Sequence, residues 1–176
     1  MAILQITLTT DDTVIPVSRI AVIDLEASGL GSASYPTEIG WAIISDDGTV
    51  TSGACLIRPA GKWTTYSNAW SPTSERLTGI SPEMPDHDGV PPREAVERFL
   101  DAVGDRDLYS DEVDFDRNWL GMLVDAAGMP LGERKLGDLN EFMRRSGLMP
   151  KFEEPPRHRG EADARRLALA LSGLRP

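Results

Sequence analysis

The sequence predicts a single α/β domain built on one mixed sheet, and three features support that prediction. Three apolar, β-branched segments follow one another at residues 19–25, 38–45 and 50–58. The Asp-Asp-Gly turn at residues 46–48 joins the second segment to the third, which is typical of an antiparallel hairpin. Amphipathic segments with helical spacing then alternate with a short strand, so helices are expected on the faces of the sheet.

The first half of the chain is expected to hold an extension, the strands and a loop-rich stretch. Residues 1–18 are interpreted as an N-terminal extension with an edge strand at Ile3–Leu8, and residues 19–176 as one domain. A short helix is expected at Pro72–Leu77, because proline is favoured in the first turn of a helix. The four prolines within residues 81–92 predict a loop there.

The second half of the chain is predicted to be mainly helical. Asp114 is the expected N-cap of one of these helices, and Gly128 is expected to end it. The predicted helices cover residues 92–103, 115–127, 139–146 and 161–171, and a strand is predicted at residues 107–110.

Composition and cysteine content predict an ordinary globular protein of the cytoplasm. Of the 176 residues, 40% are hydrophobic and 26% are charged. The chain contains no apolar run of about 18 residues, so no membrane span is expected. The N-terminus lacks the basic and apolar regions of a signal peptide. The single cysteine, Cys55, leaves no internal disulfide, which suits a reducing compartment.

Two carboxylates stand at the end of the first predicted strand. Asp24 and Glu26 are two residues apart, so both side chains project from the same face of the sheet. Ionised groups that are buried without a counter-charge are costly, and a bound cation would remove that cost. Carboxylate oxygens are hard ligands that suit Mg²⁺ or Mn²⁺. The alternative is a pair of solvated strand-end residues, and the pair alone favours that simpler interpretation.

Other candidate functional residues stand near the starts of the later helices. Asp116 lies in a predicted first turn, where an aspartate also serves simply to stabilise the helix dipole. His158, one of only two histidines, precedes Asp163 by five residues. On one continuous helix these two side chains would point in different directions. Gly160 and the prolines before it place His158 on a loop instead, so that both side chains can face one point. Taken alone, His158 would be interpreted as a surface histidine.

Together these residues resemble the DnaQ-like, DEDDh family of 3′→5′ exonucleases. The resemblance spans most of the chain, and the motifs stand in the family's order on the expected elements. Its three motifs match DLEASGL at residues 24–30, LYSDEVDFD at residues 108–116, and the spacing of His158 and Asp163. Residues 38–40 and 77–80 resemble further family segments.

The chain departs from the family pattern near the predicted site. Ala27 stands where the family more often has threonine, and Thr78 replaces a family histidine. Asp111 and Glu112 occupy positions where many relatives have His-Asn. This acidic pair adds negative charge, which is expected to alter the substrates that are accepted.

The resemblance implies a fold, a cofactor and a set of roles. The fold would be ribonuclease H-like, with three antiparallel strands, then two parallel strands, and flanking helices. His158 would be the general base that takes a proton from the attacking water. Two divalent cations, Mg²⁺ or Mn²⁺, would stabilise the attacking and leaving oxygens. The implied metal ligands are Asp24, Glu26, Asp116 and Asp163. The implied contacts to the terminal nucleotide are Ala27, Ser28, Gly29 and Leu30.

The charge of the chain narrows the expected substrates. A net charge of −10 argues against a broad basic surface that holds long nucleic acid. It is compatible with a metal-centred nuclease, because bound cations restore positive charge locally. The expected partners are 3′ ends of single-stranded DNA or RNA, or short oligonucleotides, and the expected products are nucleoside 5′-monophosphates. The choice between DNA and RNA stays open, as does the oligomeric state, for which a homodimer is one alternative.

Two other functions are compatible with the same sequence. One is a catalytically silent module that binds nucleic acid or protein on this fold. The other is an internally cutting nuclease or transposase-like member of the ribonuclease H superfold. That second class does not need His158 and Asp163 at their observed spacing.

Overall fold

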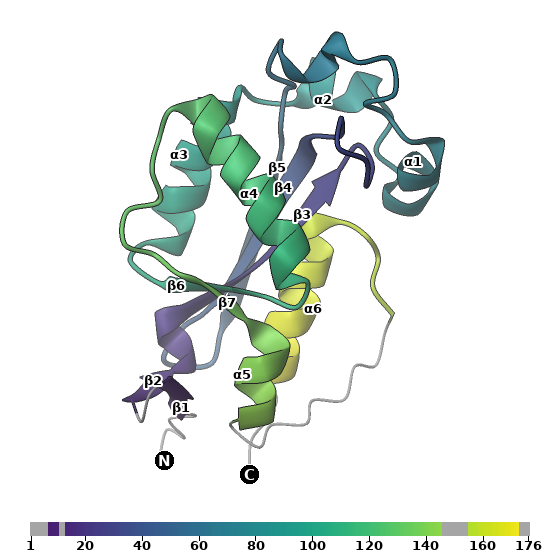
Figure 1. Ribbon diagram of the computed structural model, residues 1–176. Coiled ribbons are helices and arrows are strands. Elements are labelled where there is room, and N and C mark those ends of the chain that lie inside the picture. The colour runs from purple at the N-terminus through teal and green to yellow at the C-terminus, as the bar shows by residue number, and fades with distance from the viewer. Residues whose placement is uncertain (1–6, 11–12, 146–154, 173–176) are drawn as a thin grey trace.

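The computed structural model describes residues 7–10, 13–145 and 155–172, and a mixed sheet runs through its centre (Figure 1). The strand order is β5-β4-β3-β6-β7. β3 pairs antiparallel with β4, and β4 with β5, whereas β6 runs parallel to both β3 and β7. This confirms the predicted sheet of three antiparallel strands followed by two parallel ones. The strands are β3 (Ile20–Ala27), β4 (Pro36–Ile44), β5 (Val50–Leu56), β6 (Asp107–Ser110) and β7 (Leu136–Asp138).

Helices cover both faces of the sheet. Ala21, Ile23 and Leu25 of β3 face a core formed with α3 and α4, while Ile20 and Val22 face a second core formed with α5 and α6. This alternation follows from the two-residue period of a strand. It places Asp24 and Glu26 on the α6 side. The helices are α1 (Pro72–Thr78), α2 (Glu83–Asp88), α3 (Pro92–Val103), α4 (Val113–Ala127), α5 (Leu139–Arg145) and α6 (Gly160–Ser172), with short 3₁₀ turns at Val17–Arg19 and Trp63–Thr65.

Three details differ from the sequence-based prediction. The segment predicted as a proline-rich loop contains α2, whose Pro85 lies in the first turn, where its missing N–H would have no helical partner anyway. α4 begins two residues earlier than predicted, with Glu112 rather than Asp114 at its N-cap. β7 has three residues, too few to produce a detectable period, so the second parallel strand was expected but its position in the sequence was not predicted.

Two short strands within residues 7–16 form a second, two-stranded sheet. β1 (Thr7–Thr10) pairs antiparallel with β2 (Thr13–Pro16), and these two strands make a sheet of their own. The strand predicted at Ile3–Leu8 falls mostly outside the described residues. Within the described ranges, no helix is both long and apolar enough to cross a membrane.

α6 lies very close to the sheet because two glycines meet where it begins. A Cβ atom on Gly40 of β4 would lie 1.9 Å from the carbonyl carbon of Gly160 and 2.3 Å from the amide nitrogen of Glu161. A Cβ on Gly160 would lie 2.7 Å from the amide nitrogen of Gly40. Only hydrogen atoms fit between these backbones, so the pair sets how closely α6 approaches β3 and β4.

Gly40→Ala is therefore expected to destabilise the fold. The new methyl group would meet backbone atoms, which cannot rotate away, so α6 must shift, at a cost of about 1–3 kcal/mol or more. Urea unfolding measures the change in the free energy of unfolding. Gly121→Ala on α4 is the matched control, since its Cβ would meet nothing within 4 Å. Equal stability of the two variants would contradict the proposed close contact.

Candidate active site

Three carboxylates from distant parts of the chain meet at one end of β3. Asp24 and Glu26 lie on the face of β3 that α6 covers, and Asp163 lies in the first turn of α6. Each contributes an oxygen such that all three oxygens lie within 4.8 Å of one another. The close approach of Gly40 and Gly160 brings the start of α6 to this point. Three of the four carboxylates predicted as metal ligands are thus brought together.

The fourth carboxylate, Asp116, lies beside this group and is held by its own hydrogen bonds. It sits in the first turn of α4 and is buried. Its Oδ1 accepts a hydrogen bond from the backbone N–H of Leu25 at 2.9 Å, and its Oδ2 accepts one from the hydroxyl of Ser110. These bonds orient Asp116 between β3 and β6. Its charge raises the pKa of both Asp24 and Glu26, so the four acids form one electrostatic unit.

Asp163 organises the loop that carries His158. Its carboxylate accepts hydrogen bonds from the backbone N–H of Arg157 at 3.0 and 3.1 Å and from that of Arg159 at 3.3 Å. The Nε of Arg166, one turn further along α6, donates to it at 3.3 Å. Asp163 therefore faces Asp24 and Glu26 while it fixes the backbone on both sides of His158.

The four carboxylates, called here the acidic group, would carry an excess of negative charge in a largely buried environment. Burial raises the pKa of Asp24 well above its ordinary value, and the charge of Asp116 raises it further. Burial and then the charge of Glu38 raise the pKa of Glu26 to about 8. Burial raises the pKa of Asp116 to about 7, although hydrogen bonds from Ser110 and Leu25 oppose that rise.

One oxygen of this group lacks any partner. In the described part of the chain, Asp24 Oδ2 is one of only two buried side-chain polar atoms without a hydrogen bond, the other being Trp119 Nε1. Buried polar atoms are nearly always satisfied, and an exception calls for an explanation. A divalent cation would supply both the missing partner and the missing positive charge. The atoms that would bind this cation are all carboxylate oxygens, which suits Mg²⁺ or Mn²⁺.

The raised pKa values predict that the metal-free protein loses stability as pH rises. The unfolded chain releases the proton of Glu26 near its ordinary pKa of 4.5, whereas the folded chain keeps it until about pH 8. Between these values the folded state binds more protons, so the free energy of unfolding falls with increasing pH. Thermal unfolding in a chelator should therefore give a lower Tm at pH 8 than at pH 5.5.

Added Mg²⁺ or Mn²⁺ should remove most of this loss, because the cation favours the ionised carboxylates. Glu26→Gln is the control, since it lacks the titrating group and should show a weaker dependence of Tm on pH. A Tm that is the same at both pH values in the metal-free protein would contradict the electrostatic description of the site.

His158 lies at the edge of a pocket beside the carboxylates. It is exposed and adopts the left-handed region, with φ of 53°, the only described non-glycine residue with positive φ. The pocket has a volume of about 560 Å³, and both Asp24 and Glu26 line it together with His158. A water molecule or a phosphate group in this pocket would therefore lie next to the imidazole and the acidic group.

The segment that follows Glu26 divides into pocket-lining and internal residues. Ala27, Gly29 and Leu30 line the pocket, and their contact to a nucleotide stays a prediction. Ser28 is buried instead, and its hydroxyl donates to the carbonyl oxygen of Ala69 at 2.6 Å and accepts from the N–H of Tyr35 at 3.0 Å. The hydroxyl of Ser28 therefore holds the loop together. The close approach of a nucleotide to the backbone at Ser28 stays a prediction.

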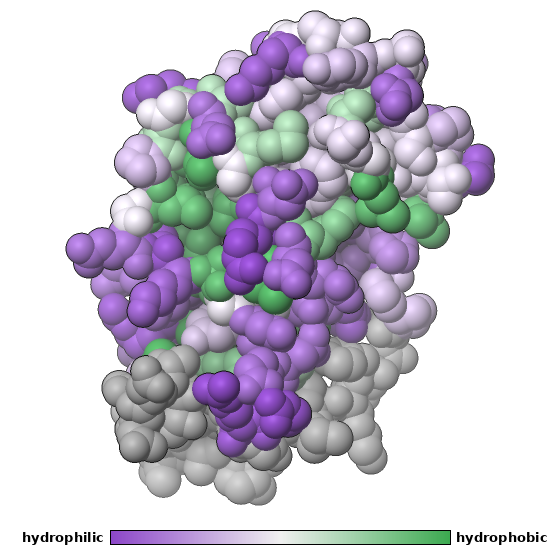
Figure 2. Space-filling model, in the orientation of Figure 1, coloured by the Kyte–Doolittle hydropathy of each residue, from purple (hydrophilic) through white to green (hydrophobic). Residues whose placement is uncertain are grey.

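The outer rim of the pocket is apolar. Leu30 and Leu77 are 82% and 55% exposed, and both line the pocket with Phe115. Figure 2 shows hydrophobic surface beside α1 on this face of the molecule. Sequence reasoning did not single out Leu77 or Phe115 for this role. Their signals were present, because Leu77 opens the segment at residues 77–80 and Phe115 directly precedes Asp116.

Comparisons with known proteins find likeness in structure and none in sequence. No protein-family model matches the chain, and no curated protein matches it. The nuclease domain of 3′hExo, a DEDDh family member solved with rAMP, superposes with a TM-score of 0.66 at 15% identity, over 88% of this chain and 90% of that one.

Two structures of exonuclease I are also similar. The zinc-bound E. coli complex with single-stranded DNA gives a TM-score of 0.63 at 14% identity, and a product-bound form gives 0.59 at 13%. Each match covers 87% of this chain but only 39% and 42% of the exonuclease I chain, respectively. The chain thus spans about two fifths of exonuclease I and nearly all of the 3′hExo domain. It has the α/β fold of the DEDDh exonuclease domain.

Proposed function

We propose that this protein is a metal-dependent 3′→5′ exonuclease that releases nucleoside 5′-monophosphates. The observation that carries the proposal is the meeting of Asp24, Glu26 and Asp163, with an unpartnered oxygen of Asp24, next to a pocket that His158 also lines. A shared fold alone does not imply a shared activity. Here both the fold and the chemistry of the site support the proposal.

Asp24, Glu26 and Asp163 would hold divalent cations, with Asp116 in support. Such cations, when bound, stabilise negative charge on the attacking and leaving oxygens of a phosphodiester. Asp116 is already oriented by Leu25 and Ser110, so it needs little rearrangement to act. The raised pKa values of Asp24, Glu26 and Asp116 mean that cation binding must displace protons near neutral pH.

The side chains around the pocket supply the remaining chemistry. His158 would accept the proton of the attacking water, and its exposure lets it pass that proton on to solvent. The apolar rim formed by Leu30, Leu77 and Phe115 would hold the terminal bases. Gly29 lets the loop stay narrow here, because a Cβ atom would lie 2.7 Å from the hydroxyl of Ser34.

Single-stranded 3′ ends or short oligonucleotides are the proposed substrates. The structural neighbours include complexes with single-stranded DNA, with short oligonucleotides and with rAMP. An overall charge of −10 disfavours long backbone contacts, and the exposed Glu112 adds a negative charge at the pocket itself. A substrate held mainly through its last nucleotides fits both facts.

The test is digestion of single-stranded oligonucleotides labelled at either the 5′ or the 3′ end, with Mg²⁺ or Mn²⁺. A 5′ label should give a ladder that shortens from the 3′ end, and a 3′ label should appear at once as mononucleotide. Matched DNA and RNA oligonucleotides would decide the sugar preference. Cutting of a circular single strand would favour an internal nuclease, and cation binding without hydrolysis would favour the silent module.

A further inference from the structure

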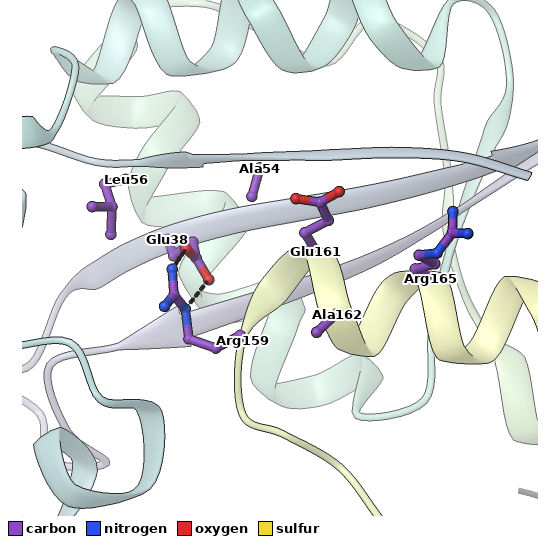
Figure 3. Close-up of a pocket in the computed structure, with 7 residues that line it drawn as sticks. All are labelled: Glu38, Ala54, Leu56, Arg159, Glu161, Ala162 and Arg165. Carbon is purple, nitrogen blue, oxygen red and sulfur yellow. Dashed lines mark hydrogen bonds and ion pairs between the residues drawn. The ribbon is translucent and has the colours of Figure 1, made fainter. Parts of the chain in front are cut away.

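The loop that carries His158 is held to β4 by an ion pair between the partly exposed Arg159 and the buried Glu38. Glu38 of β4 is 3% exposed, and its carboxylate accepts two hydrogen bonds from the guanidinium of Arg159, at 2.6 and 3.1 Å. The same carboxylate accepts the backbone N–H of Gly160 at 2.8 Å. Figure 3 shows Arg159 reaching across to Glu38 at the point where the loop enters α6.

The geometry of this contact makes it a rigid connection. Two parallel hydrogen bonds from one guanidinium fix both the distance and the plane of the two groups. The third bond, from Gly160, holds the first residue of α6 to the same carboxylate. Glu38 therefore orients the residue that directly follows His158 and the one after that.

His158 needs such support because of its backbone conformation. A non-glycine residue in the left-handed region is unfavourable and persists only where its surroundings hold it. The N–H groups of Arg157 and Arg159, on either side of His158, donate to Asp163. Asp163 thus holds this turn from the side of the acidic group, and Glu38 holds it from the side of β4.

We propose that Glu38 and Arg159 are positioning residues. They set the direction of the turn that contains His158, so that the imidazole of His158 faces the pocket beside the carboxylates. Their catalytic meaning rests on the proposed function, whereas their effect on His158 is a property of the free protein. Neither side chain lines the pocket that contains His158. Their effect on His158 passes through the backbone of residues 158–160, whereas their charges also act on Glu26.

Two substitutions of Arg159 separate geometry from charge. Arg159→Lys keeps a positive charge near Glu26 but loses the paired hydrogen bonds, and Arg159→Gln loses both. Glu38→Gln alters the other partner. The matched control is Arg165→Gln, because Arg165 lines the same cavity as Arg159 but donates to the carbonyl oxygen of Val50 at 3.4 Å instead of to Glu38.

The first readout is the NMR spectrum of the histidine rings in the full chain without metal or substrate. The protein has only two histidines, so His87, which is exposed on α2, serves as an internal reference. In Arg159→Gln, Arg159→Lys and Glu38→Gln the ring signals of His158 should shift or broaden, while those of His87 stay in place. In Arg165→Gln both sets should be unchanged.

The second readout is kinetic. Displacement of a catalytic group by about 1 Å can cost about 100-fold in rate, so kcat should fall by roughly 10- to 100-fold with little change in KM. The double variant Glu38→Gln with Arg159→Gln should lose no more than the larger single loss, because both changes break one contact. Unaltered His158 signals in folded Arg159→Lys and Arg159→Gln would overturn the inference. A wild-type protein that releases no mononucleotide would refute the proposed function, while the ring spectra would still decide the positioning role.

Discussion

Asp24→Asn is expected to abolish mononucleotide release while leaving the protein folded. Asparagine has nearly the same shape as aspartate but lacks its negative charge. The substitution also replaces the carboxylate whose Oδ2 has no hydrogen-bond partner. Metal-ion stabilisation of a transition state is worth several kcal/mol, and each 1.4 kcal/mol is about tenfold in rate, so a loss of about a thousand-fold or more is expected. The measurement is the initial rate on a 5′-labelled oligonucleotide at saturating Mn²⁺.

The same substitution should stabilise the protein in the absence of metal. Burial and the charges of Asp116 and Glu26 disfavour an ionised Asp24, and a neutral asparagine removes this unfavourable charge. Replacing an active-site residue that opposes folding in this way often raises the free energy of unfolding by about 0.5–2 kcal/mol. Asp101→Asn on the exposed side of α3 is the control for the change in net charge. Retained activity, or a loss of stability in the chelator, would count against Asp24 as a metal ligand.

The sheet, and the face of β3 that carries Asp24 and Glu26, could be predicted from the sequence alone. The period of two residues along β3 put Asp24 and Glu26 on one face, and β3 indeed presents both toward α6. The break before Gly160 predicted that His158 would leave the axis of the last helix, and α6 begins at Gly160. These predictions depend on local periodicity and on chain breaks, which single sequences record well.

The remaining features depend on contacts between residues that are distant in the sequence. The bond between Asp116 and the N–H of Leu25 spans 91 positions, and that between Arg159 and Glu38 spans 121. No periodicity encodes such pairs. Ser28 illustrates the same limit, because its hydroxyl turns inward to Ala69 rather than toward the pocket. α2 was missed for a different reason, since prolines in a first helical turn resemble those of a loop.

The acidic group and the loop around His158 are mechanically linked through Asp163. Its carboxylate faces Asp24 and Glu26 and also accepts the N–H groups of Arg157 and Arg159. A cation bound by Asp163 would therefore contact the same carboxylate that holds the turn at His158. Cation binding and alignment of the base are thus expected to be coupled, and Glu38 limits how far the turn can move in response.

His158→Asn is expected to lower kcat by about 100- to 10,000-fold, the range that general bases contribute. Asparagine tolerates the left-handed backbone that His158 adopts, so this variant removes the imidazole without adding strain. Cation affinity, measured by titration calorimetry with Mn²⁺, should change little because the carboxylates are untouched. His87→Asn, which alters the other histidine far along the chain, should retain full activity.

Chemical rescue would test the same role more directly. Glycine accepts a φ of 53° without penalty, so His158→Gly should keep the turn and leave space beside Asp24 and Glu26. Imidazole added to the solution should then restore part of the lost kcat in His158→Gly but not in Asp24→Asn. His158→Gly lacks only the proton acceptor, which free imidazole can replace, whereas Asp24→Asn lacks a metal ligand. Full activity of His158→Asn, or an equal response of both variants to imidazole, would remove His158 from the mechanism and leave the carboxylates to activate water without it.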